Sequence, residues 1–211
     1  MSFDLLAPHY RWMEALCAGG QLQRCRTALL GAIHAPRRAL VYGEGNGRFL
    51  VKLLRHFPQV QVTVVEASAV MIDLARKRLV REGLEGAQVE FVHADALTWQ
   101  APAAAFDLIV SCFFLDCFRE DQLKTLIPVI AAAATAEAQW LIADFQIAHA
   151  GMWRACSRLI VGVLYAFFRW TTGISARELV RVEAYLSGEN FTRGERREFL
   201  WGLLFCECWR R

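Results

Sequence analysis

Three glycines alternate with Glu44 and Asn46 in the stretch "VYGEGNG", directly after the apolar run at 39–42. They are Gly43, Gly45 and Gly47. A strand that ends in this spacing and opens a helix points backbone N–H groups, and the positive end of the helix dipole, at a ligand. A side chain at these positions would block the approach. The loop therefore predicts a ligand that lies close to the backbone, although glycine turns also occur for purely structural reasons.

Two carboxylates follow at the ends of the next two apolar runs. Glu66 ends "VTVVEAS", about 20 residues after the loop, where a carboxylate can accept hydrogen bonds from both hydroxyls of a ribose. Asp95 ends "VEFVHADAL" and can accept a hydrogen bond from the exocyclic amine of an adenine. A dinucleotide fingerprint would need a third glycine at the position of Arg48. The motifs together predict a nucleoside site without the full dinucleotide fingerprint.

The segments that must hold these motifs alternate between strand and helix patterns. Strands are predicted at 39–42, 60–66, 88–93, 106–112 and 139–145, and helices at 8–18, 22–33, 49–56, 68–82 and from about 120. Ser68 can cap its helix, and Pro128 should kink the last helix or end it early. Residues 191–211 predict an antiparallel hairpin. This alternation indicates an α/β fold with a doubly wound, mostly parallel, seven-stranded sheet, preceded by N-terminal helices.

In this order the motifs resemble those of the class I S-adenosylmethionine-dependent methyltransferases of the small-molecule type. The resemblance covers roughly residues 39–145, through "ALVYGEGNGRF", "VTVVEAS", "VEFVHADAL", "FDLIVSCFFLDCF" and "WLIADF". It implies S-adenosylmethionine as the cofactor, with the glycines along its methionine part, Glu66 at the ribose, and Asp95 with the Ala96 backbone at the adenine. The implied cofactor-binding set also includes Tyr10, Glu44, Ala67 and Ser111.

Three positions depart from the family pattern. Val41 stands where many members have an acidic residue, so a polar anchor for the loop is missing. The sequence "TAEAQ" replaces the usual Pro-Gly-Gly turn before the fifth strand. Glu44 replaces a residue that is usually small and neutral. Its carboxylate either meets the ammonium group of the cofactor, or fixes Tyr10 or Arg11 over the site, or lies in water as an ordinary loop carboxylate.

Length and composition suit one domain with a full core. The chain has 211 residues, 55% of them hydrophobic, and a formal net charge of +3. We expect a single methyltransferase domain, with a helical cap at 1–35, a cofactor-binding core at 36–146, a helical substrate region at 147–190 and a closing hairpin at 191–211. Lys and Arg outnumber Asp and Glu by 24 to 21, so charge argues neither for nor against a nucleic-acid partner.

The cysteines and the N-terminal residues predict a cytoplasmic location. Seven cysteines are an odd number without a CxxC pair or a histidine at zinc-finger spacing, so we interpret them as reduced thiols and predict no metal site. Cys206 and Cys208 would share one face of a strand and are interpreted as packed thiols. Residues 1–10 carry Asp4 where a signal peptide would be basic, and their apolar stretch is too short for one.

A sulfonium methyl group is already electrophilic, so its transfer requires alignment with a nucleophile and exclusion of water more than a catalytic residue. A general base matters for a poorly acidic hydroxyl or amine. Asp116, in "FFLDCF", is the candidate catalytic base, because apolar neighbours would raise its pKa. The alternative is that Asp116 caps the following helix. Asp144 and His149 are weaker candidates, and His149 is interpreted as a solvated loop residue.

The resemblance implies that elements outside the core select the substrate, here the N-terminal helices and residues 151–185. Apolar residues form a helical stripe from Trp153 to Phe168, with arginines such as Arg154 and Arg158 on the other side. One interpretation is that the stripe lines a site for an apolar or aromatic small molecule, which could also carry an acidic group. The alternatives are that the stripe packs on the sheet, or that it makes peripheral contact with a membrane surface. Its longest uninterrupted apolar stretch, 159–168, is too short to span a bilayer.

We expect methyl transfer to an O, N, S or C nucleophile on an apolar or aromatic small molecule. The alternatives are an RNA or protein methyltransferase, and a cofactor-binding partner subunit without catalysis. Enzymes of this family that methylate nucleobase amines or protein glutamine tend to carry Asn or Asp, Pro, Pro and an aromatic residue where this chain has "SCFF". Nucleic acid is therefore not favoured. Monomer and homodimer are both left open, because the apolar C-terminal hairpin can pack internally or across a dimer.

Overall fold

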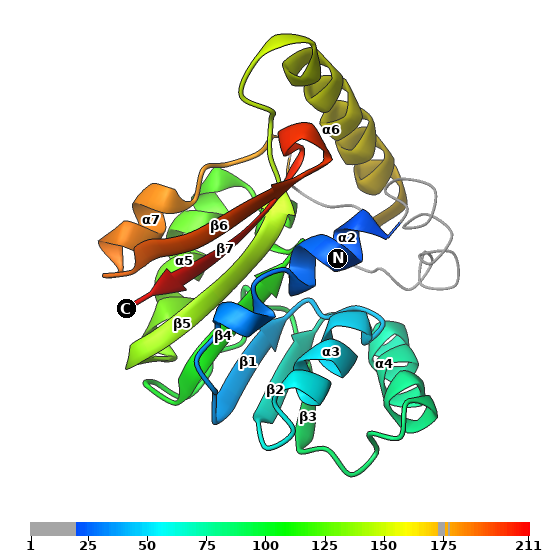
Figure 1. Ribbon diagram of the computed structural model, residues 1–211, viewed down its shortest axis with the longest axis vertical. Coiled ribbons are helices and arrows are strands. Elements are labelled where there is room, and N and C mark those ends of the chain that lie inside the picture. The colour runs from blue at the N-terminus through cyan, green and yellow to red at the C-terminus, as the bar shows by residue number, and fades with distance from the viewer. Residues whose placement is uncertain (1–19, 173–175, 177) are drawn as a thin grey trace.

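A seven-stranded sheet organises the residues that the structure, a computed structural model, describes: 20–172, 176 and 178–211. The strands are β1 Arg38–Tyr42, β2 Gln61–Glu66, β3 Val89–His93, β4 Phe106–Cys112, β5 Ala134–Phe145, β6 Thr192–Phe199 and β7 Leu204–Arg210. They lie in the order β3-β2-β1-β4-β5-β7-β6 (Figure 1). Strand β7 is antiparallel to β5 and β6, and the other neighbouring pairs are parallel. The predicted mostly parallel sheet with its antiparallel C-terminal hairpin is thus confirmed.

The register of the parallel strands brings the predicted ligand motifs to one edge. Tyr42, the last residue of β1, lies opposite Val65 of β2 and Ser111 of β4. Glu66, the last residue of β2, lies opposite His93 at the end of β3. Because parallel strands end on the same side, the loops that follow them emerge together. The glycine loop, Glu66 and the turn after β3 are therefore neighbours at the carboxyl edge of the sheet.

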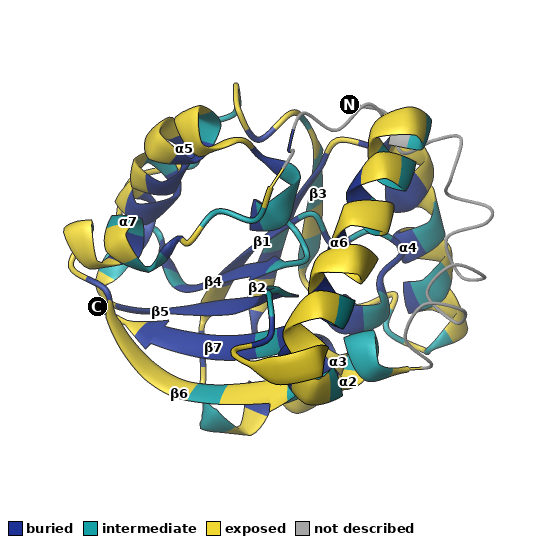
Figure 2. Ribbon diagram, turned by 90° about the horizontal axis from the view of Figure 1, so that it is seen from above, coloured by how far each residue is buried: buried dark blue, intermediate teal, exposed yellow. Residues whose placement is uncertain are grey.

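Helices cover both faces of this sheet (Figure 1, Figure 2). The helices and 3-10 turns are α2 Gln21–Thr27, η1 Leu30–Ala32, α3 Arg48–His56, α4 Ala69–Arg81, η2 Leu115–Cys117, α5 Glu120–Ala132, α6 Gly151–Thr172, α7 Glu183–Gly188 and η3 Leu200–Gly202. Val41 of β1 belongs to a buried cluster that includes Leu53 of α3. The adjacent Leu40 points to the opposite face and packs in a cluster that includes Ile127 of α5. Strand β1 is therefore buried on both faces, as its apolar sequence predicts.

Three local predictions differ from the structure. Helix α5 does not end early at Pro128 but continues to Ala132, because the proline faces solvent, where water can bind the carbonyl group that has lost its N–H partner. Strand β5 begins at Ala134, so "TAEAQ" is strand, and its pairing with β4 shifts register after Phe106. The segment 22–33 divides into α2 and η1, and Gly31 weakens a continuous helix there. The helix predicted at 8–18 lies outside the described residues.

The described cysteines are free thiols. Cys206 and Cys208 are both fully buried on β7, which agrees with their interpretation as packed thiols. Among the described residues, no three His, Cys, Asp or Glu side chains are grouped so that they could hold a metal ion. No helix in the same part of the chain combines the length and the hydropathy needed to cross a membrane.

Candidate cofactor and acceptor site

The loop between β1 and α3 uses its three glycines differently. A Cβ atom on Gly47, whose φ is 83°, would lie 2.9 Å from the Ala75 Cα atom, so this glycine lets the loop pack against α4. A Cβ atom on Gly43 would lie 2.7 Å from Cδ2 of Phe114. A Cβ atom on Gly45 would meet no atom within 4 Å. The open space is therefore beside Gly45, where a ligand can approach the backbone.

Glu44 turns inward from this loop and caps helix α3. Its Oε1 atom accepts hydrogen bonds from the backbone N–H groups of Phe49 and Leu50, both at 3.0 Å. The N-cap residue, Gly47, has no side chain to accept them. Burial raises the pKa of Glu44 to about 7, although the two N–H donors and the charge of Arg26 oppose this shift. The expectation of a loop carboxylate in water is therefore wrong, because the helix N-terminus binds the carboxylate in the interior.

Glu66 stands at the end of β2 with its carboxylate held by the backbone. Its Oε2 atom accepts a hydrogen bond from the N–H of Gly45, and its Oε1 atom accepts one from the N–H of Ser68, each at 3.0 Å. Burial raises the pKa of this carboxyl, and the backbone donors act in the opposite direction. Each carboxylate oxygen can accept a second hydrogen bond. Glu66 can therefore still accept hydrogen bonds from a hydroxyl-bearing ligand beside Gly45.

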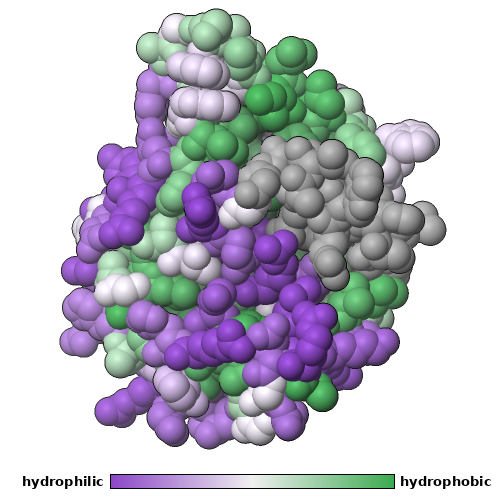
Figure 3. All heavy atoms as spheres, turned by 45° about the vertical axis from the view of Figure 1, so that its right-hand side comes forward, coloured by the Kyte–Doolittle hydropathy of each residue, from purple (hydrophilic) through white to green (hydrophobic). Residues whose placement is uncertain are grey.

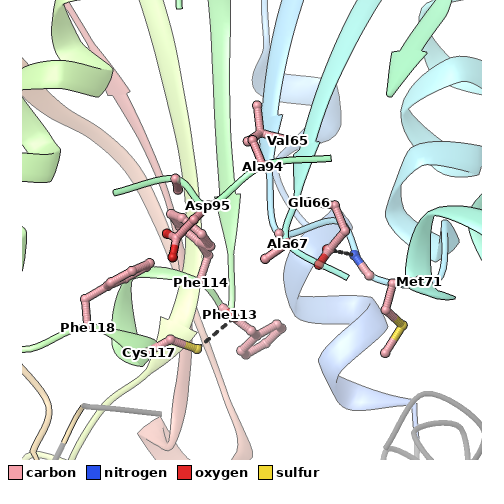
Figure 4. A pocket seen from close by; sticks show the side chains of 13 residues that line it. Val65, Glu66, Ala67, Met71, Ala94, Asp95, Phe113, Phe114, Cys117 and Phe118 are labelled. Carbon is pink, nitrogen blue, oxygen red and sulfur yellow. Dashed lines mark hydrogen bonds between the residues drawn. The ribbon is translucent and has the colours of Figure 1, made fainter. Parts of the chain in front are cut away.

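Glu66 and Asp95 line opposite sides of a cavity of about 100 Å³, which we call the glycine-loop cavity (Figure 4). Its other lining residues are Gly43, Gly45, Val65, Ala67, Met71, Ala94, Ala96, Phe113, Phe114, Cys117 and Phe118. The Asp95 Oδ1 atom accepts a hydrogen bond from the Leu97 N–H at 2.9 Å, which fixes the turn after β3. The structure thus brings together the predicted cofactor residues Gly43, Gly45, Glu66, Ala67, Asp95 and Ala96.

Other residues of the implied set lie elsewhere. Ser111 is fully buried, and its hydroxyl accepts a hydrogen bond from Nε1–H of Trp140 at 2.9 Å. The alternation of side chains along β4 turns Ser111 into the core, which contradicts its predicted place at the cofactor. Tyr10 lies outside the described residues. Sequence reasoning missed the aromatic lining at Phe113 and Phe114, although their position directly after a strand that reaches the ligand edge was a usable signal.

Asp116, in η2, and Asp144, at the end of β5, form a hydrogen-bonded pair of carboxyl groups. The backbone N–H of Asp116 also donates to Oδ2 of Asp144 at 3.2 Å. Burial raises the pKa of Asp116 to about 6, and it raises the pKa of Asp144 together with the neighbouring negative charge. Asp116 does not cap α5, whose N-cap residue is Arg119, so that alternative is wrong. The pair is able to share or take up a proton.

A second cavity, of about 590 Å³, lies on the other side of η2. We call it the arginine cavity, after Arg154, Arg158, Arg181, Arg193 and Arg196 in its lining. Leu115 and Asp116 line this cavity, whereas Phe114 and Cys117 line the glycine-loop cavity. His149 also lines it, and its exposed ring is hydrogen-bonded to Glu198 at 3.0 Å. The η2 turn therefore separates the two cavities.

Helix α6 exposes much of its apolar stripe. Leu159 is 70% exposed and Val163 is 60% exposed, whereas Ser157, Val161 and Tyr165 are buried. Figure 3 shows apolar residues at the upper end of the molecule, where Figure 1 places this helix. The hydroxyls of the buried serine and tyrosine make hydrogen bonds to backbone groups of the body. The expectation that the stripe packs on the sheet is therefore wrong for Leu159 and Val163, because the opposite side of the helix makes these contacts.

The fold and the glycine-loop cavity define a class of protein. A parallel sheet with helices on both faces presents a glycine loop after β1, a carboxylate at the end of β2 and another after β3. Ligands of open α/β sheets bind at this edge. The chain therefore contains a Rossmann-like domain that carries these three groups at its ligand edge.

Comparison with known proteins narrows this class. Residues 39–136 match a family model described as a methyltransferase domain. A demethylmenaquinone methyltransferase of Deinococcus radiodurans is 30% identical over 113 residues, which are 53% of this chain and 46% of the relative. A malonyl-[acyl-carrier protein] O-methyltransferase of a Paenibacillus species is 34% identical over 116 residues, 53% of this chain and 40% of the relative. The chain thus spans about half the length of these relatives or less.

Solved methyltransferase structures share the fold over nearly the whole chain. The mitomycin 7-O-methyltransferase MmcR has a TM-score of 0.73 at 20% identity, with 100% of this chain and 61% of that chain covered. A Burkholderia thailandensis 1,6-didemethyltoxoflavin-N1-methyltransferase, solved with S-adenosylhomocysteine, has a TM-score of 0.67 at 17% identity, with 99% and 85% covered. The chain is thus similar to methyltransferases in sequence over about half of its length, and it shares their fold over nearly all of it.

Proposed function

We propose that this chain transfers a methyl group from S-adenosylmethionine to an O, N, S or C nucleophile on an apolar or aromatic small molecule. The observation that carries the proposal is the cavity that Gly45, Glu66 and Asp95 line together at the carboxyl edge of the sheet. All three residues lie in the segment that matches the methyltransferase domain. Each group has a chemistry that suits one part of the cofactor.

The open backbone at Gly45 accommodates the methionine part, since a Cβ atom would fill the space that a ligand needs. Glu66 accepts hydrogen bonds from the ribose hydroxyls, and Asp95 with the Ala96 backbone binds the adenine. The glycine-loop cavity of about 100 Å³ is smaller than the roughly 300 Å³ of an ordinary small-molecule site. Binding therefore moves the aromatic side chains Phe113 and Phe114, which line it, and a crystal structure with S-adenosylhomocysteine checks this movement.

The residues around the cavity perform the remaining tasks of methyl transfer. When bound, the cofactor supplies an electrophilic methyl group. Phe113, Phe114 and Phe118 exclude water from this region and help to align an acceptor. The Asp116–Asp144 pair takes the proton of a hydroxyl or amine acceptor, whereas a thiolate or carboxylate acceptor needs no base. The chain therefore acts mainly through positioning and desolvation.

Calorimetric titration with S-adenosylhomocysteine tests the cofactor site. We expect the wild type to bind, and Glu66→Ala to bind about 100-fold more weakly, because two hydrogen bonds to a charged acceptor are lost. Glu90→Ala, which removes an exposed carboxylate on β3, is the matched control and should leave the affinity unchanged. If the wild type does not bind S-adenosylhomocysteine, the proposal is wrong.

A panel of phenol, thiol and amine acceptors tests the transfer step. Formation of a methylated product with any of these small molecules supports the proposal, and the product identifies the nucleophile. Cofactor binding without transfer to any acceptor, small molecule, RNA or protein, would favour the non-catalytic partner subunit. The two measurements together separate cofactor binding from catalysis.

A further inference from the structure

The arginine cavity has no role in holding the cofactor as proposed above. It is lined by the start of α6, the end of β5, the hairpin β6–β7 and the segment 179–183. Its volume of about 590 Å³ is in the range of sites that enclose small molecules. Leu115, Ile142 and Phe205 contribute apolar surface to its wall. The cavity can therefore hold a small organic molecule with an apolar part.

The buried acidic groups of the cavity are already neutralised within the protein. Glu207, which is 1% exposed, is paired with Arg196, lies 3.6 Å from Nη1 of Arg193, and accepts a hydrogen bond from Nε1–H of Trp209 at 2.9 Å. Asp116 and Asp144 are hydrogen-bonded to each other, and protonation of one member removes a charge from this pair. These groups do not need a ligand for their neutralisation.

Three other arginines of the cavity lack such partners. Arg154 and Arg158 lie one turn apart on α6, and Arg181 reaches the cavity from the segment before α7. Within the described part of the chain, none of the three guanidinium groups has a carboxylate partner. Glu183 is a lining carboxylate that likewise has no partner there, so three unpaired positive charges face one negative charge. The described residues that line the cavity thus carry an excess of positive charge.

The cavity is also adjacent to the position where methyl transfer is proposed. Asp116 lines the arginine cavity and Cys117 lines the glycine-loop cavity, and the Cys117 Sγ atom lies 3.5 Å from the Asp116 Oδ1 atom. A single 3-10 turn, η2, thus forms the wall between them. An acceptor can therefore stay in the arginine cavity while only its nucleophilic group reaches past η2 toward the glycine-loop cavity.

We propose that the arginine cavity binds the methyl acceptor, and that this acceptor is a small molecule with a carboxylate group held by Arg154, Arg158 and Arg181. The planar guanidinium group binds a carboxylate through two parallel hydrogen bonds. The apolar wall holds the body of the acceptor, and the nucleophile points to η2. This inference rests on the proposed function, which supplies the methyl donor on the other side of the turn.

Ligand-observed NMR with benzoate, benzamide and phenyl phosphate, at saturating S-adenosylhomocysteine, tests the inference. We expect the wild type to bind benzoate about tenfold more tightly than the uncharged benzamide, and more tightly than phenyl phosphate. The double variant Arg154→Gln with Arg158→Gln should lose about tenfold in benzoate affinity, and so should Arg181→Gln. Arg169→Gln, which changes an exposed arginine of α6 outside the cavity, is the matched control and should not change it.

The outcomes that would contradict the inference are distinguishable from one another. Equal affinity for benzoate and benzamide, or unchanged binding in the arginine variants, excludes an anion site. If the wild type binds phenyl phosphate more tightly than benzoate, the carboxylate of the proposed acceptor is wrong and the site selects a phosphate group. S-adenosylhomocysteine binding is measured separately in the same samples, so a wild type that binds the cofactor but not benzoate contradicts this inference alone. A wild type that fails to bind the cofactor contradicts the proposed function.

Discussion

The two cavities beside η2 differ in what determines their shape. At the glycine-loop cavity, the polar contacts join a carboxylate to backbone N–H groups, as Glu66 does with Gly45 and Ser68. At the arginine cavity, some of them join side chains from different strands, as between Arg196 and Glu207. Backbone groups are the same in every sequence, whereas a side-chain contact is lost or gained by one substitution. The shape of the first cavity therefore depends mainly on the backbone, and that of the second depends mainly on its side chains.

The elements that surround the two cavities also differ in how they are attached to the rest of the fold. Glycine packing and buried carboxylates tie the loop around Gly45 to α3 and α4. The cover of the arginine cavity includes the start of α6, a helix with an exposed apolar stripe. We therefore expect substitutions at the first cavity to affect stability and cofactor binding together. Substitutions around the second should affect acceptor binding or local opening with little loss of global stability.

Gly47→Ala should have the largest effect on stability, because two costs add at this position. A residue with a side chain is strained at a φ of 83°, and the new Cβ atom would lie 2.9 Å from backbone of α4 at Ala75. We expect the free energy of unfolding to fall by about 3 kcal/mol. Urea unfolding followed by circular dichroism measures the change.

Gly45→Ala is the matched comparison. Its φ of 68° brings similar strain, but the new Cβ atom meets no atom within 4 Å, so stability should fall by only about 1 kcal/mol. The affinity for S-adenosylhomocysteine should nevertheless fall by at least about tenfold, because the methyl group occupies the open space of the site. A larger loss of stability for Gly45→Ala than for Gly47→Ala would contradict the different roles of the two glycines.

Glu44→Ala should have the next largest effect, because it leaves the N–H groups of Phe49 and Leu50 without their acceptor. We expect a loss of about 2 kcal/mol in the free energy of unfolding. Glu44→Gln keeps an acceptor oxygen and should recover part of the loss. The effect also depends on pH, since burial raises the pKa of Glu44 from 4.5 to about 7. Between these values the folded protein binds more protons than the unfolded chain.

The contribution of Glu44 to stability should therefore fall as the pH rises from about 4.5 to about 7, and stay level above that. The glutamine variant does not titrate at this position. Urea unfolding across the interval should show the wild type losing stability relative to Glu44→Gln. Glu90→Gln, at an exposed position of β3, is the control without such a trend. A wild type that gains stability relative to Glu44→Gln as the pH rises would show that the carboxylate is not buried as described.

Most of the sheet is predictable from sequence, because strands buried on both faces leave long apolar runs. The run "FDLIVSC" predicts β4 with its observed ends, Phe106 and Cys112. The predictions that differ from the structure depend on solvent exposure and on tertiary pairing. Pro128 can stay inside α5 because it is on the exposed side of the helix, where solvent replaces the lost hydrogen bond. The early start of β5 depends on an irregular pairing with β4, which is a tertiary property.

The candidate site is predictable to the extent that strand ends determine it. Glu66 ends one strand and Asp95 lies two residues after the next, and the two strands are neighbours, so the proximity of the carboxylates follows from topology. The direction of a side chain is harder to predict. Glu44 and Ser111 both lie near this edge, but one caps α3 and the other bonds to Trp140 in the core. The arginine cavity draws on residues more than 60 positions apart, so no local motif could reveal it.

The smallest expected effect concerns the attachment of α6 to the hairpin. Trp153 of α6 stacks on Trp201 of η3 with ring centroids 4.3 Å apart and an angle of 10° between the planes. Both rings are exposed, at 39% and 64%, so a double-mutant cycle with Ala should give a coupling of about 0.5–1 kcal/mol. Trp170→Ala, on the same helix and 86% exposed, is the control.

Amide hydrogen exchange can show which elements the Trp153–Trp201 stacking stabilises. If the stacking holds the cover of the arginine cavity, Trp201→Ala should speed the exchange of α6 amides several-fold and leave those of β1 unchanged, since β1 lies in the core and exchanges through larger openings. Equal acceleration in both elements would mean that the two regions open together. In that case the proposed independence of the two cavities would be wrong, and acceptor binding could not vary without affecting the cofactor side.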